Sequence, residues 1–217
     1  MTTSIETQIA EFNEGFDAQI GPVLARTFAG EQEDLRAAGL PDGVVKVGHT
    51  LPEASLLTAD GTATDLSTVL AGAPSVLVFY RGAWCPYCNI TLKTYQAELL
   101  PALTAQGVGL VAISPQHPDR TADTATSAGL GFTVLSDPSN ALAATLGIVT
   151  APSAEARSAH TELGFEVSDN NADGTPRVPF PTVLVVDAAG TVRFVDVQVD
   201  YTSRTEVHTV LEAVRQL

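Results

Sequence analysis

The strongest constraint on this chain is a Cys-x-x-Cys motif between an apolar run and a helical pattern. The apolar run, residues 75–80, reads Ser-Val-Leu-Val-Phe-Tyr, as expected of a strand buried on both faces. The motif Cys85-Pro86-Tyr87-Cys88 contains the only two cysteines of the 217 residues, and a helical pattern follows over residues 89–100. Pro86 suits a first helical position, where its missing N–H costs nothing. A dithiol at a strand-to-helix junction indicates redox chemistry.

Strand and helix patterns alternate along the rest of the chain from residue 47. We predict a hairpin over 56–65, strands over 75–80, 108–114, 132–135, 182–187 and 191–199, and helices over 66–70, 85–105, 121–127, 141–146, 154–163 and 205–217. The proline at position 101 should kink the longest of these helices near its end. This alternation, closed by a hairpin and a helix, predicts an α/β sandwich.

The first 45 residues have a different texture and predict a helical arm. Apolar residues recur there at steps of three and four, which is the spacing of one helix face: Ile5, Ile9, Phe12, Phe16 and Ile20. Gly21-Pro22 should interrupt this helix, and a second helix should run to Ala38. We expect the apolar stripe to pack on the main domain or on a partner subunit. The expected organisation is an extension over 1–45 and one domain over 46–217.

The charge balance narrows the classes of partner. Lys and Arg number 11 against 25 Asp and Glu, a net charge of −14, so the surface offers no positive field for nucleic acid or an anionic membrane. The N-terminus lacks the basic and apolar regions of a secretory signal, and no apolar run is long enough to span a bilayer. We expect a cytoplasmic protein, in which a cysteine pair is catalytic or metal-binding rather than structural.

The position of each cysteine on the predicted helix suggests its role. Cys85 falls at the helix start, where free N–H groups and the macrodipole lower a thiol pKa, so we expect it to be exposed and acidic. Cys88 lies about one turn further and could attack an oxidised Cys85 to form a disulfide. A zinc site needs four ligands, and the four histidines show no paired ligand spacing. Two buried, inert cysteines stay open as an alternative.

These motifs resemble the peroxiredoxin (AhpC/TSA) family of the thioredoxin superfamily from about residue 47 to the C-terminus. The segments that carry the resemblance are 47–52, the hairpin turning at 60–61, 76–86, 112–115, 134–137 and Pro181-Thr182 with the strand after it. The resemblance implies a three-layer sandwich with a central mixed sheet, with Cys85 as peroxidatic and Cys88 as resolving cysteine. It also implies that the Phe180–Pro181 bond is cis and that Pro181 and Thr182 face the dithiol.

The chain departs from the family pattern at two positions before the first cysteine. Peroxiredoxins typically carry a proline seven residues and a threonine or serine three residues before it, and here those positions hold Val78 and Gly82. The motif itself is the glutaredoxin-type tetrapeptide after a thioredoxin-type tryptophan, Trp84. The sequence is therefore similar to a peroxiredoxin-like subgroup that holds a Cys-x-x-Cys, in which Pro86 and Tyr87 belong to the active-site tetrapeptide.

Three further side chains are candidates for the same site. Arg81, four residues before Cys85, could lower a thiol pKa or bind an oxyanion, or could be a solvated surface charge. Arg204 could line the same face or belong to a helix-cap region. His117 lies in a loop after a predicted strand, where it could act in acid–base chemistry or be solvated. We expect no metal and no cofactor, because no nucleotide-binding glycine loop is present and the acidic run at 169–174 lacks the glutamate of a calcium loop.

Three functions remain compatible with the sequence. The first is a thiol-dependent antioxidant enzyme that reduces hydroperoxides, with thioredoxin, a glutaredoxin-type protein or a low-molecular-weight thiol as reductant. The second is a protein disulfide reductase of thioredoxin or glutaredoxin type, which Trp84 and Pro181 favour. The third is a non-enzymatic, redox-responsive binding protein. A homodimer is compatible with each of them.

Overall fold

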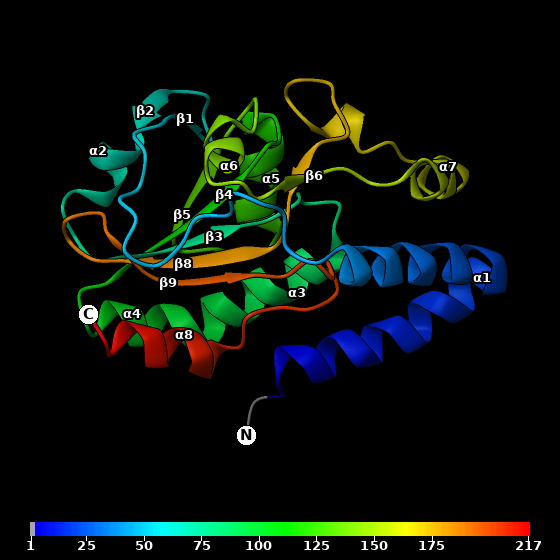
Figure 1. Ribbon diagram of the computed structural model, residues 1–217, viewed down its shortest axis with the longest axis horizontal. Coiled ribbons are helices and arrows are strands. Elements are labelled where there is room, and N and C mark those ends of the chain that lie inside the picture. The colour runs from blue at the N-terminus through cyan, green and yellow to red at the C-terminus, as the bar shows by residue number, and fades with distance from the viewer. Residues whose placement is uncertain (1–2) are drawn as a thin grey trace.

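The computed structural model describes residues 3–217, and Figure 1 shows its arrangement. Its strands are β1 (Ser55–Thr58), β2 (Ala63–Asp65), β3 (Ser75–Phe79), β4 (Gly109–Ser114), β5 (Thr133–Ser136), β6 (Val149–Thr150), β7 (Val178–Pro179), β8 (Thr182–Val186) and β9 (Val192–Val197). Its α-helices are α1 (Ile5–Ala38), α2 (Leu66–Leu70), α3 (Pro86–Thr94), α4 (Leu100–Thr104), α5 (Pro118–Ser127), α6 (Ala141–Thr145), α7 (Ala154–Glu162) and α8 (Val207–Val214). The strands and helices predicted from residue 47 onward are confirmed with ends shifted by a few residues, except that the helix predicted over 85–105 is divided by a π-helical turn.

A seven-stranded mixed sheet forms the middle layer, in the order β2-β1-β5-β4-β3-β8-β9. The neighbours β3, β4 and β5 run parallel, whereas β8 lies antiparallel to β3, with Phe79 opposite Thr182. Every residue of β3 and β8 is buried, because these central strands are covered on both faces. The ends of β3 and β4 that lead into loops therefore meet at one edge, where functional groups of α/β folds gather.

Two apolar clusters separate the sheet from its helices. One cluster joins β3, β4 and β8 to α3, α4 and α8 and includes the start of α1. The other lies on the opposite face and joins the sheet to α2 and α6. Figure 1 shows these two helix layers below and above the sheet. The expected three-layer sandwich with a mixed central sheet is confirmed.

The arm folds as two helical segments joined at a sharp kink. Ser4 caps its first turn by accepting a hydrogen bond from Thr7 N, and Gly39 ends its second segment with φ of 70°. Between them Gly21 adopts φ 81° and ψ 166°, which turns the chain where the sequence predicted a break. Ile5 and Ile9 are buried against the domain, so the first segment packs as its apolar stripe predicted.

The long helix after the dithiol differs from the prediction. It does not simply kink at Pro101 but widens into a π-helical turn, η1 (Tyr95–Leu99), just before that proline. The ring of a proline collides with the carbonyl four residues earlier and removes an N–H, and a widened turn accommodates both effects. Tyr95 lies fully buried in this turn and donates a 2.6 Å hydrogen bond to the carbonyl of Thr205. The π turn thereby fastens the helix to the segment that carries Arg204.

Candidate active site

The loop between β3 and α3 places Cys85 at the cap of the helix. Cys85 is the N-cap of α3 with Pro86 at the first helical position, as predicted. The loop is held by three hydrogen bonds: Ala83 N to Gln116 Oε1 at 2.8 Å, Asn89 Nδ2 to Ala83 O at 2.7 Å and Cys85 N to Gly82 O at 3.1 Å. Gln116 is completely buried just beyond β4. The sequence indicated the adjacent His117 in this loop as a candidate, but not Gln116.

Gly82 adopts a backbone conformation that other residues avoid. Its φ is 148°, and a Cβ added there would lie 2.5 Å from Trp84 Nε1 and 3.0 Å from Gln116 Cδ. A threonine at this position would therefore displace both side chains. The close packing of Trp84 and Gln116 on this backbone explains why the family's hydroxyl cannot be accommodated.

Both cysteines are free, and both are buried at 1% exposure. The expectation that Cys85 is exposed is wrong, because the arm and α7 cover the helix start. Cys85 nevertheless lines a cavity of about 470 Å³, whereas Cys88 lines a gap of only about 10 Å³ beneath it. Of the two sulfurs, Cys85 is the one that a small molecule can reach.

The two thiols form a hydrogen-bonded pair in which the negative charge favours Cys88. Burial raises the pKa of Cys88, but the hydrogen bond from Cys85, the charge of Arg204 and the backbone N–H of Arg81 outweigh it and lower the pKa to about 5. Burial, together with the hydrogen bond and charge of Cys88, raises the pKa of Cys85 well above its ordinary value. The expectation that Cys85 is the more acidic thiol is therefore wrong for the resting pair, since its partner takes the stronger share of the positive charge.

Arg204 is the cation that touches both sulfurs. Its Nη2 lies 3.4 Å from Cys88 Sγ and 3.8 Å from Cys85 Sγ. Its Nη1 donates to the carbonyls of Tyr201 and Ser203, so the guanidinium is held in place by the backbone of its own loop. The structure thus brings Arg204 to the dithiol, and its shorter contact with Cys88 contributes to the lowered pKa of that thiol.

Pro181 and Thr182 lie on the opposite side of Cys88, as the sequence led us to expect. Both line the small gap that Cys88 shares with Arg204. The expected cis bond before Pro181 is wrong, because the described residues contain no cis peptide bond. The trans form is intrinsically preferred before proline, and two hydrogen bonds fix the segment in it: Phe180 N to Ile148 O at 2.7 Å and Gln198 N to Pro181 O at 2.9 Å.

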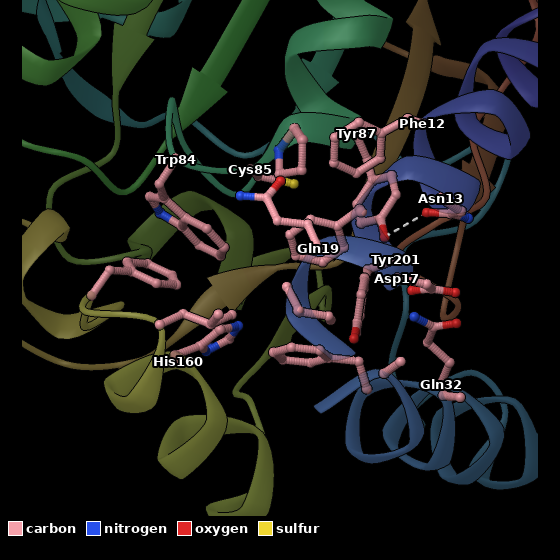
Figure 2. A pocket seen from close by; sticks show the side chains of 18 of the residues that line it. Phe12, Asn13, Asp17, Gln19, Gln32, Trp84, Cys85, Tyr87, His160 and Tyr201 are labelled. Atoms are coloured by element: carbon pink, nitrogen blue, oxygen red, sulfur yellow. Dashed lines mark hydrogen bonds between the residues drawn. The ribbon is translucent and has the colours of Figure 1, made fainter. Parts of the chain in front are cut away.

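The cavity at Cys85 is enclosed by the arm on one side and α7 on the other (Figure 2). Aromatic rings supply much of its wall: Phe12, Phe16, Phe28, Trp84, Tyr87, Phe165 and Tyr201. Tyr87 donates a 2.9 Å hydrogen bond to Asn13 Oδ1, which joins the active-site helix to the arm. The sequence indicated that the arm packs on the domain, but no local signal indicated that its rings would line the site.

Arg81 is buried between two of these rings. Its guanidinium carbon lies 4.3 Å from the ring centroid of Tyr201 and 4.9 Å from that of Trp84, and only 5% of the residue is exposed. Among the described residues no carboxylate lies within ion-pair distance of it. The surface-charge alternative for Arg81 is therefore wrong, and its charge acts on the cysteines and on the cavity.

His160 is a cavity residue that the sequence analysis did not select. Its ring lies 4.7 Å from that of Phe165 and 6.1 Å from that of Trp84, and its buried Nδ1 has no hydrogen-bond partner. Burial and the nearby charge of Arg81 lower the pKa of His160 to about 4, so the ring is neutral at pH 7. His117, in contrast, is exposed at the start of α5 and is not among the cavity residues, so its candidacy for the site is wrong.

Residues 3–217 contain no cluster of three or more side chains suited to a metal ion, and no helix among them has the length and apolarity to cross a membrane.

Comparison with known proteins identifies the family of the chain. The model of the AhpC/TSA family matches residues 47–195, more than half of the chain, and the chain belongs to that family. A search of curated proteins finds no match. The matched segment begins after the arm, so α1 and its share of the cavity wall lie outside it.

Solved structures with similar folds include peroxiredoxins. Peroxidoxin BcpB from Mycobacterium tuberculosis is 22% identical with a TM-score of 0.62, over 80% of this chain and 98% of that one. Reduced Prx3 in complex with H2O2 from Vibrio vulnificus is 19% identical with a TM-score of 0.64, over 79% and 99%. Yeast mitochondrial 1-Cys peroxiredoxin is 18% identical with a TM-score of 0.60, over 79% and 76%. At these identities the likeness establishes a thioredoxin-like fold of the peroxiredoxin type.

Proposed function

We propose that this protein is a thiol-dependent peroxidase that reduces hydroperoxides through Cys85 and Cys88. The observation that carries the proposal is the arrangement of the pair: Cys85 lines the cavity, Cys88 lies behind it, and Arg204 contacts both sulfurs. Membership of the AhpC/TSA family supports it, as does the likeness to a peroxiredoxin crystallised with H2O2.

The first step is attack of the Cys85 thiolate on the hydroperoxide. The reduced pair holds one proton, and when that proton moves to Cys88 the charge lies on the sulfur that faces the cavity. The thiolate bonds to the terminal peroxide oxygen, the O–O bond breaks, and the alkoxide or hydroxide leaves with a proton from water. Cys85 is then a sulfenic acid and the peroxide has become an alcohol or water.

Resolution follows within the pair. The sulfur of Cys88 attacks that of Cys85, the S–OH bond breaks, and the leaving hydroxide takes the Cys88 proton to form water. The sum is one hydroperoxide and two thiols converted into an alcohol (or water), a water and a disulfide. Because the two cysteines lie on one helical turn and Arg204 contacts both sulfurs, this step needs little movement.

Arg81 and Arg204 stabilise different negative charges in the proposed mechanism. Arg204 stabilises the thiolate through its contacts with both sulfurs. Arg81, buried at the cavity without a carboxylate partner, stabilises the negative charge that develops on the departing oxygen. This assigns to a guanidinium part of the role that a hydroxyl at position 82 would otherwise fill.

The remaining assignments concern the kind of peroxiredoxin and its setting. The tetrapeptide Cys85-Pro86-Tyr87-Cys88 supports our assignment to a subgroup with its resolving cysteine on the same helix turn. We assign residues 46–217 to the catalytic domain and 1–45 to an arm that closes over it, in a cytoplasmic protein that could act as a homodimer. Thioredoxin, a glutaredoxin-type protein or a small thiol would return the electrons.

The burial of the dithiol favours peroxide over protein disulfides as the oxidant. A protein disulfide reductase must bring its sulfur into contact with a partner's surface, and both sulfurs are 1% exposed. Trp84 corresponds to the tryptophan beside the motif in such enzymes, but here it packs against Phe165, with 5.1 Å between the ring centroids. A hydroperoxide can enter the cavity, and a folded protein cannot.

Rapid mixing tests the proposal. Reduced protein is mixed with hydrogen peroxide or cumene hydroperoxide while the fluorescence of Trp84, the only tryptophan, is followed. We expect oxidation well above the rate of free cysteine, absent in Cys85→Ser and arrested before the disulfide in Cys88→Ser. Oxidation no faster than free cysteine would reject a peroxidase. Rapid reduction of insulin by the same protein would support the disulfide reductase instead.

A further inference from the structure

The reduction of the disulfide raises a question of access, because the reductant must reach the same buried pair as the peroxide. A thiolate breaks a disulfide by direct contact with one of its sulfurs. Cys85 lines the cavity of about 470 Å³, whereas Cys88 faces a gap of about 10 Å³. Attack must therefore come at Cys85, through the cavity.

The arm that encloses this cavity is fastened at several separate points. Asn13 binds Tyr87 at 2.9 Å, Arg36 forms a 2.5 Å ion pair with Asp200, Glu31 accepts from Ser153 N at 2.8 Å, and Glu206 caps the first turn by accepting from Ile5 N and Glu6 N. These contacts join both arm segments to the domain. A protein reductant would have to break several of them before its sulfur could touch Cys85.

The cavity volume lies in the range of sites for small organic molecules, which run to several hundred Å³. A water molecule occupies roughly 30 Å³, so the space far exceeds what hydrogen peroxide needs. Its aromatic wall favours an apolar body, and the cation among its lining residues is Arg81. The exposed Asp17 of the arm lines it as well, so the lining carries one charge of each sign and the aromatic wall decides the preference.

We propose that the cavity between the arm and α7 is the binding site for a low-molecular-weight thiol with an uncharged, apolar body, which reduces the Cys85–Cys88 disulfide from the Cys85 side. This rests on the proposed function, because peroxide turnover is what generates the disulfide. The proposal narrows the reductants compatible with the sequence to one class. It also gives the arm, which lies outside the family-matched segment, a role in selecting the reductant.

The chemistry balances with two molecules of the thiol. The first, as a thiolate, bonds to Cys85 Sγ while the S–S bond breaks and Cys88 leaves as a thiolate. Arg204, 3.4 Å from that sulfur, stabilises the leaving charge. A second thiolate attacks the mixed disulfide at the sulfur of the small molecule, so Cys85 leaves and takes up a proton. Two small thiols become one disulfide, and the protein pair is reduced.

The test measures re-reduction alone, so it does not depend on peroxide. Protein oxidised with diamide is mixed with benzyl mercaptan, 2-mercaptoethanol, glutathione or reduced thioredoxin at equal thiol concentration, and Trp84 fluorescence reports the return to the dithiol. We expect benzyl mercaptan to be about tenfold faster than 2-mercaptoethanol, and faster than glutathione and thioredoxin. Thioredoxin or glutathione as the fastest reductant would overturn the proposal.

Two variants on the arm separate the cavity from a general effect of the arm. Phe28→Ala removes a ring of the wall and should reduce the preference for benzyl mercaptan at least threefold. Val23→Ala removes methyl groups from the same arm at a residue that is 66% exposed and does not line the cavity, and should leave the preference unchanged. An unchanged preference in Phe28→Ala, with the protein folded by circular dichroism, would show that the thiol does not use this cavity. Slow peroxide oxidation with normal re-reduction would instead reject only the proposed function.

Discussion

Cys85 and Cys88 occupy one helical turn, are equally buried, and face opposite surroundings. Cys85 borders a large aromatic cavity, and Cys88 borders a nearly closed gap with Arg204. The accessible sulfur is thus not the one that holds the charge at rest. The difference teaches that access to a sulfur and stabilisation of a thiolate are separate properties at this site.

The largest expected effect comes from the loop on the Cys85 side, at Gly82. Gly82→Ala forces a side chain into a backbone with φ 148° and against Trp84 and Gln116, and should lower the free energy of unfolding by about 3 kcal/mol. Gly164→Ala is the matched control, since Gly164 has φ 82° and no neighbour within 4 Å of an added Cβ, and should cost about 1 kcal/mol. Urea unfolding measures both. Equal losses would mean that the loop is not tightly packed on the Cys85 side.

Variants of Arg204 test how the surroundings of Cys88 stabilise the thiolate. With the first ionisation of the pair at a pKa of about 5, oxidation by peroxide should be constant above pH 6 and fall about tenfold per unit below pH 5. Arg204→Met should move that midpoint upward and lower the rate at pH 6 by roughly 30-fold. Arg204→Lys should restore much of the rate, because it returns the charge. The exposed Arg215 provides the control, Arg215→Met. A midpoint that does not move would remove Arg204 from the charge balance.

Gln116 supports the Cys85 side from beneath the loop. Gln116→Ala leaves Ala83 N–H buried without its acceptor and should lower the unfolding free energy by about 2 kcal/mol. Peroxide oxidation should slow as well, because the loop positions Cys85. Gln106→Ala, which removes only a hydrogen bond to a helix carbonyl near the surface, should stay within about 0.5 kcal/mol. No difference between the two variants would show that Gln116 does not hold the loop.

The smallest effect concerns the neutral ring in the cavity wall. The pKa of His160 is lowered to about 4 in the folded protein, below the ordinary 6.5, so the unfolded chain binds the extra proton between these values. Stability should therefore be full above about pH 6.5 and decline by about 1–2 kcal/mol on acidification to pH 5. His160→Phe should lose this part of the decline in thermal unfolding at several pH values. An unaltered decline would place the titrating group elsewhere.

The fold was largely predictable because its elements have strong local patterns. Residues 75–80 are apolar without alternation, as expected of a central strand buried on both faces. Gly21-Pro22 interrupts a helix, because proline lacks an N–H and fixes φ. Pro101 indicates a disturbed helix, but the form of the disturbance was not predictable, since Tyr95 in the π turn is hydrogen-bonded to Thr205, more than a hundred residues away. The local sequence pattern thus predicted the helices and strands, but not how they adjust to one another in the folded protein.

The residues of the site also divide into those that the sequence indicated and those that it did not. The two cysteines, Trp84 and Arg81 were selected from the motif and its flanks, and Arg204 was selected as a candidate for the same face. The structure brings all five together. Gln116 could have been found by applying to the whole β4 loop the rule that selected His117. The rings of the arm and His160 could not, because only tertiary packing brings them to Cys85. The order of the two thiol pKa values was not predicted for the same reason, since Arg204 lies 116 residues from Cys88 in sequence.

The most direct measurement identifies which sulfur peroxide oxidises. Reduced Cys88→Ser and Cys85→Ser are each given one equivalent of hydrogen peroxide with dimedone, and the sulfenic acid adduct is located and timed by mass spectrometry. The proposed mechanism predicts rapid labelling of Cys85 in Cys88→Ser and no labelling of Cys88 in Cys85→Ser over the same period. Labelling of Cys88 at a comparable rate would contradict it, because the sulfur with the lower pKa would then also be the one that peroxide reaches.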